Sequence, residues 1–151
     1  MSMSLSDQIN ADIKVAMLAK DKGKLDALRA AKSAFLLANT EKGKSGDLEE
    51  EDAIKIIQKL VKQRKESLEI YKTQNRDDLA QVESEQIAVL EVYLPAQMGE
   101  EELRAGLSEL MESIGASSGA DIGKAMGSAM KAFAGKADNQ RIASIVKELL
   151  M

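Results

Sequence analysis

The sequence contains neither cysteine nor histidine among its 151 residues. The absence of cysteine excludes disulfide bonds, thiolate nucleophiles and cysteine-based zinc sites. The absence of histidine removes the commonest general base and the commonest metal ligand. Because most nucleophilic and metal-dependent active sites need one of these two residues, we predict no catalytic residues, no metal site and no bound cofactor.

Proline and aromatic residues are also scarce. The chain has one proline, Pro95, and aromatic residues make up only 3% of it. The core must therefore be built from isoleucine, leucine, valine, alanine and the eight methionines. Few of the β-branched and aromatic clusters that strands favour are present, so the composition favours helix.

Neither a strong charge of one sign nor a long apolar run is present. The net charge of −4 gives the whole molecule no attractive field for nucleic acid or an anionic membrane, so any such binding needs a local patch. No stretch of about 18 apolar residues occurs, and the region from Met1 to Asp12 lacks the basic and apolar parts of a secretory signal. We therefore expect no membrane partner and a cytoplasmic location.

Apolar residues recur every three or four positions before Pro95, which is the spacing of amphipathic helices. Four helices are expected there, with these apolar stripes: Ile9, Ile13 and Met17; Leu25, Leu28, Phe35 and Leu36; Ile54, Ile57, Val61, Leu68 and Tyr71; Leu79, Val82, Gln86, Val89, Leu90 and Tyr93. Ser4 or Ser6 is expected to cap the first helix, which should end at 21–23. Helix two should run out near Asn39, and polar residues predict a loop over 40–47.

Beyond Pro95 the helices are shorter and the glycines more frequent. Three are expected, with these apolar stripes: Leu103, Leu107, Leu110, Met111 and Ile114; Ile122, Met126, Ala129, Met130 and Phe133; Ile142, Ile145, Val146, Leu149 and Leu150. Ser117 and Ser118 faintly resemble an amidase segment, but capping of the next helix is the better interpretation, and Asp138 is expected to cap the last. The chain is thus predicted to be all-α, with a four-helix domain over 1–94 and a three-helix domain over 95–151.

Basic residues gather in two places. From Gly115 to Met151 there are five basic and three acidic residues, and the long third helix carries six basic residues against Glu66 and Glu69. Solvated helix faces are one explanation, and contact with nucleic-acid phosphates is the other. The candidate phosphate-binding residues are Lys124, Lys131, Lys136, Arg141 and Lys147 near the end of the chain, and Lys55, Lys59 and Lys62 in the long helix. No aromatic platform for base stacking accompanies them.

Arg64 is the one charge on the otherwise apolar stripe of the long helix. A buried or half-buried arginine usually pairs with a carboxylate. Glu83 and Glu85 of the following helix are the candidate partners, and a structural role is favoured for Arg64.

Several short motifs occur in a specific order and spacing. The strongest are Tyr93-Leu94-Pro95-Ala96-Gln97-Met98, Asp121-Ile122-Gly123-Lys124-Ala125-Met126 and Gly135-Lys136-Ala137-Asp138. With Leu28-Arg29, the run over 61–67, and Arg76 followed by Asp78-Leu79-Ala80, they resemble the linked pattern of the GatB/YqeY family along nearly the whole chain. The chain is most similar to a stand-alone YqeY-like protein.

This resemblance implies a four-helix N-terminal domain followed by a three-helix C-terminal domain similar to the tail of GatB. GatB belongs to the glutamine-dependent amidotransferase that converts misacylated Glu-tRNA or Asp-tRNA into Gln-tRNA or Asn-tRNA, and its tail helps to hold the tRNA. The implied partners are tRNA, a tRNA amidotransferase or another protein. The family label of carbon–nitrogen ligase with glutamine as amido-N-donor is also implied, but the catalytic domains of that enzyme are far larger than anything left over here.

The function expected from the sequence is a helical tRNA-binding or amidotransferase-associated module without a visible catalytic site. The alternative is a protein-interaction adaptor with no role in nucleic-acid binding. Salt-dependent binding to tRNA separates the two, because affinity dominated by phosphate contacts falls steeply with salt.

Overall fold

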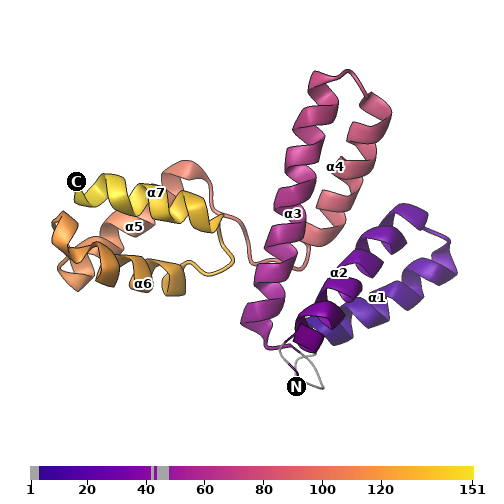
Figure 1. Ribbon diagram of the computed structural model, residues 1–151, viewed down its shortest axis with the longest axis horizontal. Helices are drawn as coiled ribbons and strands as arrows, with labels where there is room; N and C mark the ends of the chain where they lie inside the picture. The colour runs from indigo at the N-terminus through magenta and orange to yellow at the C-terminus, as the bar shows by residue number, and fades with distance from the viewer. Residues whose placement is uncertain (1–3, 42, 44–47) are drawn as a thin grey trace. The chain divides into compact units, whose positions relative to one another are not determined.

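The computed structural model describes residues 4–41, 43 and 48–151. Within these ranges the chain forms helices and no strand, so the predicted all-α class is confirmed. Seven α-helices and one short 3-10 helix follow one another in this part of the chain (Figure 1): α1 (Leu5–Ala19), α2 (Lys22–Glu41), α3 (Glu50–Thr73), α4 (Asp77–Glu91), α5 (Glu100–Ile114), η1 (Gly119–Asp121), α6 (Ile122–Ala132) and α7 (Asn139–Leu150).

Local signals set the ends of α1. The Ser4 hydroxyl accepts a hydrogen bond from the Asp7 N–H at 3.1 Å, which satisfies a free amide of the first turn. Lys20 takes the left-handed conformation, with φ 57°, and stops the helix. Since α2 already begins at Lys22, both Lys22 and Gly23 lie inside α2, and the predicted helix end at 21–23 is wrong for these two residues.

Helices α3 and α4 run side by side as a hairpin (Figure 1). The turn between them contains Asn75 with φ 59°, a left-handed conformation that asparagine tolerates better than most residues. The α4 helix ends at Glu91, ahead of Pro95, as expected. The preceding helix α2 continues to Glu41, past the predicted end near Asn39, and residues 42 and 44–47 of the predicted loop lie outside the described residues.

The core of the first four helices contains more alanine than the sequence pattern indicates. Its buried residues are Leu5, Ile9, Ile13, Ala16, Ala27, Leu28, Ala31, Phe35, Leu48, Ala53, Ile57, Val61, Ile87 and Leu90. Three residues predicted for the apolar stripes are instead largely exposed, with exposed fractions of 53% for Met17, 58% for Leu36 and 47% for Val82. The stripes are rotated in this way because small side chains let neighbouring helices approach closely, and tight packing then favours that face.

Helices α5, α6 and α7 bury their own apolar faces. Leu103, Leu107, Met111, Ala125, Ala129, Ala137, Ile142, Ile145, Val146 and Leu150 form one cluster, and Met126, Met130 and Phe133 pack against it half-buried. Gly115 ends α5 with φ 72°, and Gly135 bends the chain between α6 and α7 with φ 76°. Gly106 permits the close approach of the Phe133 ring.

The chain divides into two compact units, Met1–Leu94 and Pro95–Met151. Each unit contains one of the two hydrophobic clusters described above. The first unit holds α1 to α4 and the second holds α5 to α7 with η1. The candidate site residues of each unit are therefore positioned by that unit's own core.

Candidate nucleic-acid interface

Two of the predicted phosphate-binding lysines project from an uncrowded face of α6. Lys124 and Lys131 are both exposed and lie seven residues apart, which is about two helical turns, so they share one side of the helix. Open space surrounds Gly127, which lies between them, and Gly123, which precedes Lys124, because a Cβ added at either glycine would meet no atom within 4 Å. The Lys124 ammonium donates to the Ile114 carbonyl at 3.4 Å, which holds it near the end of α5.

Lys136 lies in the turn between α6 and α7, where its backbone and its side chain have different environments. Its N–H donates to the Phe133 carbonyl at 3.0 Å and its carbonyl accepts from the Met98 N–H at 2.9 Å. The residue itself is exposed. The backbone thus fixes the position from which the ammonium group reaches solvent.

Arg141 is already engaged by acidic side chains. Its Nε donates to Glu100 Oε2 at 2.6 Å and its second terminal nitrogen pairs with the other oxygen of the same carboxylate. Glu100 also lies 3.5 Å from Arg104, which in turn donates to Glu148 at 2.7 Å. These four half-exposed residues, the α5–α7 ion network, join the two helices. Contact between Arg141 and a phosphate would have to compete with a carboxylate that holds it on two nitrogens.

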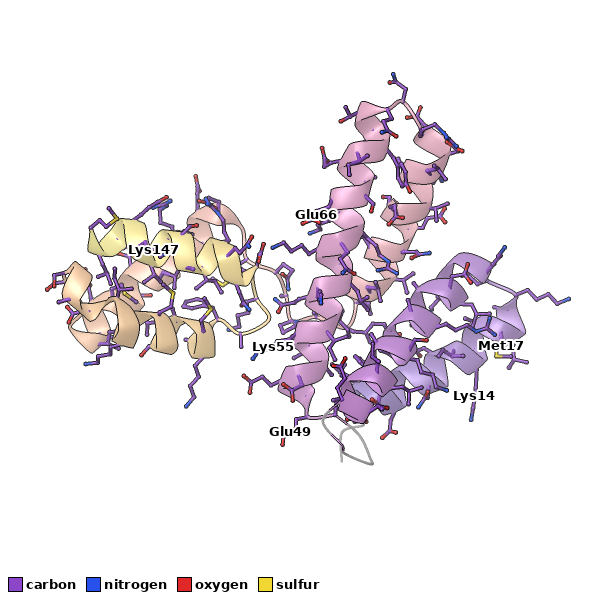
Figure 2. All side chains as sticks on the ribbon, viewed as in Figure 1. Lys14, Met17, Glu49, Lys55, Glu66 and Lys147 are labelled. Atoms are coloured by element: carbon purple, nitrogen blue, oxygen red, sulfur yellow. The ribbon has the colours of Figure 1, made fainter. Side chains whose placement is uncertain are left out.

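Lys147, labelled in Figure 2, is exposed in the last turn of α7, where a cation interacts favourably with the helix dipole. The second unit as a whole is not cationic, because residues 95–151 contain six basic and eight acidic side chains. Five of the acidic residues belong to α5. Any phosphate surface is therefore restricted to α6, the turn after it and the end of α7.

The second group of candidates lies on α3 in the first unit. Lys55 and Lys59 are exposed and Lys62 is half-buried. The Lys55 ammonium lies 3.6 Å from Glu51 Oε1, one turn earlier on the same helix. Figure 2 shows Lys55 and Glu66 on the side of α3 that points away from α4. Acidic residues thus occur at both ends of this stripe and weaken its attraction for phosphate.

Arg64 has a different partner from the one predicted. Its Nε donates to Gln86 Oε1 at 2.8 Å, and a terminal nitrogen donates to the Leu60 carbonyl at 3.1 Å. The prediction of Glu83 or Glu85 as partner is therefore wrong. The two glutamates lie one and three residues before Gln86, and the packing of α3 on α4 brings the amide to Arg64 instead. The bond joins these two helices, which is the structural role expected of Arg64.

The family motifs of the second unit meet at one place. Gln97 Nε2 donates to the Pro95 carbonyl at 2.8 Å and to the Gly135 carbonyl at 2.7 Å. Beside it, the Met98 N–H donates to the Lys136 carbonyl. We call these four residues, Gln97, Met98, Gly135 and Lys136, the motif clasp. It ties the segment that leads into α5 to the turn between α6 and α7, so the spacing of these residues along the chain has a structural use.

Two motif aspartates cap helices. Asp121 Oδ2 accepts from the Ser117 N–H at 3.0 Å, and the Ser118 side chain completes a capping box at the start of η1. Asp138 accepts from the Gln140 N–H at 3.1 Å at the start of α7. The interpretation as a cap is confirmed for Ser118 and the prediction for Asp138 is confirmed, whereas Ser117 instead donates its own N–H to Asp121.

The remaining motif residues lie at helix ends and in the cores. The Tyr93 hydroxyl donates to Asp12 Oδ2, which joins the end of α4 to α1. Burial, and then this hydrogen bond, raise the pKa of Tyr93 above its ordinary value. Leu94 packs partly buried against the first core, Met126 against the second, and Gly123 is exposed.

Sequence reasoning missed several of these contacts. The hydrogen bond between Tyr93 and Asp12 joins residues 81 positions apart, and no local sequence pattern predicts it. Gln97 belongs to one of the motifs, but the sequence does not predict which two carbonyl oxygens accept its hydrogen bonds. The spacing of four between Glu100 and Arg104 was readable as a helical ion pair.

In the part of the chain that the structure describes, no three acidic side chains gather closely enough to hold a metal ion, and no helix is both long and apolar enough to cross a membrane. A hollow of about 100 Å³ lies between α1 and α2.

One known protein family matches almost the whole chain. The family described as Yqey-like protein matches residues 6–150. The chain belongs to the Yqey-like family. The resemblance found in the motifs is thereby confirmed for the family, and the match covers the motif clasp and both helix-capping aspartates.

Three relatives of this Yqey-like chain share one name, "Altered inheritance of mitochondria protein 41, mitochondrial". The protein from Clavispora lusitaniae is 28% identical over 113 residues, which are 74% of this chain and 65% of that protein. The protein from Saccharomyces cerevisiae is 36% identical over 89 residues, or 57% and 46% of the two chains. The protein from Pyrenophora tritici-repentis is 26% identical over 147 residues, or 95% and 79%. The matches thus span less than two thirds of the first two relatives.

These names correct the expected cytoplasmic location. All three relatives are named as mitochondrial proteins, which points to mitochondria rather than the cytoplasm. The expectation failed because it rested on the lack of a secretory signal. That feature separates exported proteins from the rest and does not distinguish the cytoplasm from the interior of an organelle.

Proposed function

We propose that this Yqey-like chain is a helical tRNA-binding module that acts with a tRNA amidotransferase. The observation that carries the proposal is the exposed group formed by Lys124 and Lys131 on α6 and Lys136 in the next turn, which we call the α6 lysine surface. Such ammonium groups are suited to phosphate oxygens, and phosphate contacts supply most of the affinity of non-specific nucleic-acid binding.

The proposal includes the domain organisation. We propose a four-helix domain over residues 1–94 and a three-helix domain over residues 95–151 similar to the tail of GatB. The two compact units and their separate cores support the division. The motifs at the clasp and the two caps support the likeness to the GatB tail. The names of the relatives support a mitochondrial location for the activity.

The α5–α7 ion network changes the set of residues proposed to touch RNA. Arg141 is held by Glu100, and its exchange would disturb the packing of α7 on α5 as well as the charge. The proposed contacts are therefore the α6 lysine surface, and Lys147 in the last turn of α7 is a further candidate. Lys55, Lys59 and Lys62 on α3 form a secondary candidate, because Glu51 and Glu66 lie along the same stripe.

Filter binding of the full chain to bulk tRNA at about 50 and 200 mM salt tests the proposal. Each phosphate contact contributes about −0.7 to −0.9 to the slope of log affinity against log salt, so the three contacts of the α6 lysine surface alone give a slope of about −2.1 to −2.7. The affinity should then fall by about 20- to 40-fold between the two salt concentrations. Absence of salt-dependent binding would contradict the proposal and leave the protein-interaction adaptor as the function.

A further inference from the structure

The hollow between α1 and α2 is lined by both polar and apolar side chains. Helix α1 contributes Ser6, Ile9 and Asn10, and helix α2 contributes Lys32, Phe35, Leu36 and Asn39. Ile9 and Phe35 belong to the buried core and form its apolar base. Asn10, Lys32 and Leu36 are exposed and form its rim.

The size of the hollow indicates what it can hold. Its volume of about 100 Å³ is well below the roughly 300 Å³ at which ligand pockets begin. It is closer to the roughly 150 Å³ of an engineered protein cavity that holds benzene. A single apolar side chain is therefore a better match than a whole cofactor or metabolite.

Basic side chains border the groove that leads away from the hollow. The connection between α1 and α2 is so short that the helices run antiparallel, and their ends near it lie together. Lys14 follows Asn10 by one turn of α1, and Arg29 precedes Lys32 by one turn of α2, so both lie on the side toward the connection. All three basic residues are exposed, and Asp7 is the acidic residue on the adjoining turn of α1. Carboxylates of a partner would match this border.

Apolar side chains continue the groove. Met17 is 53% exposed on α1, and Leu36 is 58% exposed at the rim of the hollow. Figure 2 shows Lys14 and Met17 projecting outward from α1. The flexible thioether of methionine adapts well to the surface of a partner.

We infer that this surface, the α1–α2 groove, binds an acidic amphipathic helix of a partner protein. One apolar side chain of that helix enters the hollow above Ile9 and Phe35, and a second packs against Met17. Its glutamates or aspartates pair with Lys14, Arg29 and Lys32. This is the helix-in-groove mode of peptide recognition, in which apolar anchors recur at helical spacing. The inference is independent of tRNA binding, which involves other residues.

A synthetic peptide tests the inference on the full chain. The probe is a fluorescein-labelled 16-residue helical peptide with leucine on one face and glutamate on the other, and a second peptide carries lysine in place of glutamate. Fluorescence anisotropy should show saturable binding of the glutamate peptide and at least tenfold weaker binding of the lysine peptide. Equal binding of the two peptides, or no binding of the first, would overturn the inference.

Variants locate the binding site. R29E with K32E should weaken binding of the glutamate peptide at least tenfold, and Leu36→Gln should weaken it several-fold, whereas the control K131E with K147E, which makes the same charge change, should alter it less than twofold. Circular dichroism should show every variant folded, because the exchanged residues are exposed. An equal loss in the control would refute the groove as the site. Concentration-dependent dimers that R29E with K32E abolishes would show a second copy as the occupant and also refute it.

Discussion

At the scale of single residues, Gly106 shows how closely the second unit is packed. A Cβ at this position would lie 2.9 Å from Cζ and 3.0 Å from Cε1 of Phe133, closer than real Cβ contacts. The ring packs against the core formed by α5, α6 and α7, so moving it loses contacts there. A methyl group at residue 106 is therefore expected to force a shift.

The exchange Gly106→Ala should lower the free energy of unfolding relative to the matched exchange Gly127→Ala. The first overpacks a helix contact, at a cost of about 1–3 kcal/mol. The second lies on the open face of α6 and gains about 0.5–1 kcal/mol from helix propensity. Urea unfolding followed by circular dichroism measures both, and equal stability of the two variants would contradict the packing described for Phe133.

The Tyr93 hydroxyl is a second residue whose contribution can be measured. Tyr93→Phe removes its hydrogen bond to Asp12 and should cost about 1–3 kcal/mol, the range for a bond to a charged group. Because the pKa of Tyr93 is raised in the folded state, the unfolded chain loses this proton first, near its ordinary pKa of about 10. The contribution is fully present below pH 10 and is lost as the pH rises through the higher folded value.

Urea unfolding of both proteins between about pH 8 and pH 12 tests this, since the difference in stability should shrink above pH 10. A difference that stayed constant across that range would show that the hydroxyl is not protected in the fold.

At the scale of helices and turns, the motif clasp is expected to hold the second unit together. Gln97→Ala leaves the Pro95 and Gly135 carbonyls without this donor, and Gly135 is buried. The loss should reduce the free energy of unfolding by about 1–3 kcal/mol. The control Gln74→Ala, at an exposed position after α3, should stay within about 0.5 kcal/mol of the original protein. Similar values for the two variants would show that the clasp adds nothing to stability.

Helices were readable from the sequence because their signals are local. Apolar spacing and capping residues such as Ser4 and Asp138 lie within a few positions of the backbone groups that they affect. The end of α1 was misjudged because Lys20, and not a glycine, takes the left-handed conformation. That position gives no compositional signal.

Contacts between side chains that are far apart in the sequence were harder to predict. Arg64 was expected to find a carboxylate and instead meets Gln86, because the rotation of α4 decides which side chain faces it. The distribution of charge along the sequence was enough to identify the candidate lysines. Their ammonium groups stay at the surface because hydration stabilises them. The engagement of Arg141 by Glu100 depends on the packing of α7 against α5, which a helical pattern does not specify.

At the scale of the whole molecule, the two units should fold independently. Residues 1–94 and residues 95–151 each contain a complete hydrophobic cluster, so each fragment should be helical by circular dichroism and unfold cooperatively on heating. If either fragment is unfolded by itself, the proposed division into domains is incorrect.

The proposed binding of tRNA by the α6 lysine surface through phosphate contacts is tested most directly by a salt titration of variants. A triple variant, K124A with K131A and K136A, is compared with the control K14A with K32A and K72A, which removes the same charge from the first unit. The triple variant should flatten the slope of log affinity against log salt by about 2, for all tRNAs alike, while the control keeps the original slope. A folded triple variant that binds tRNA with the original affinity and slope would contradict the claim.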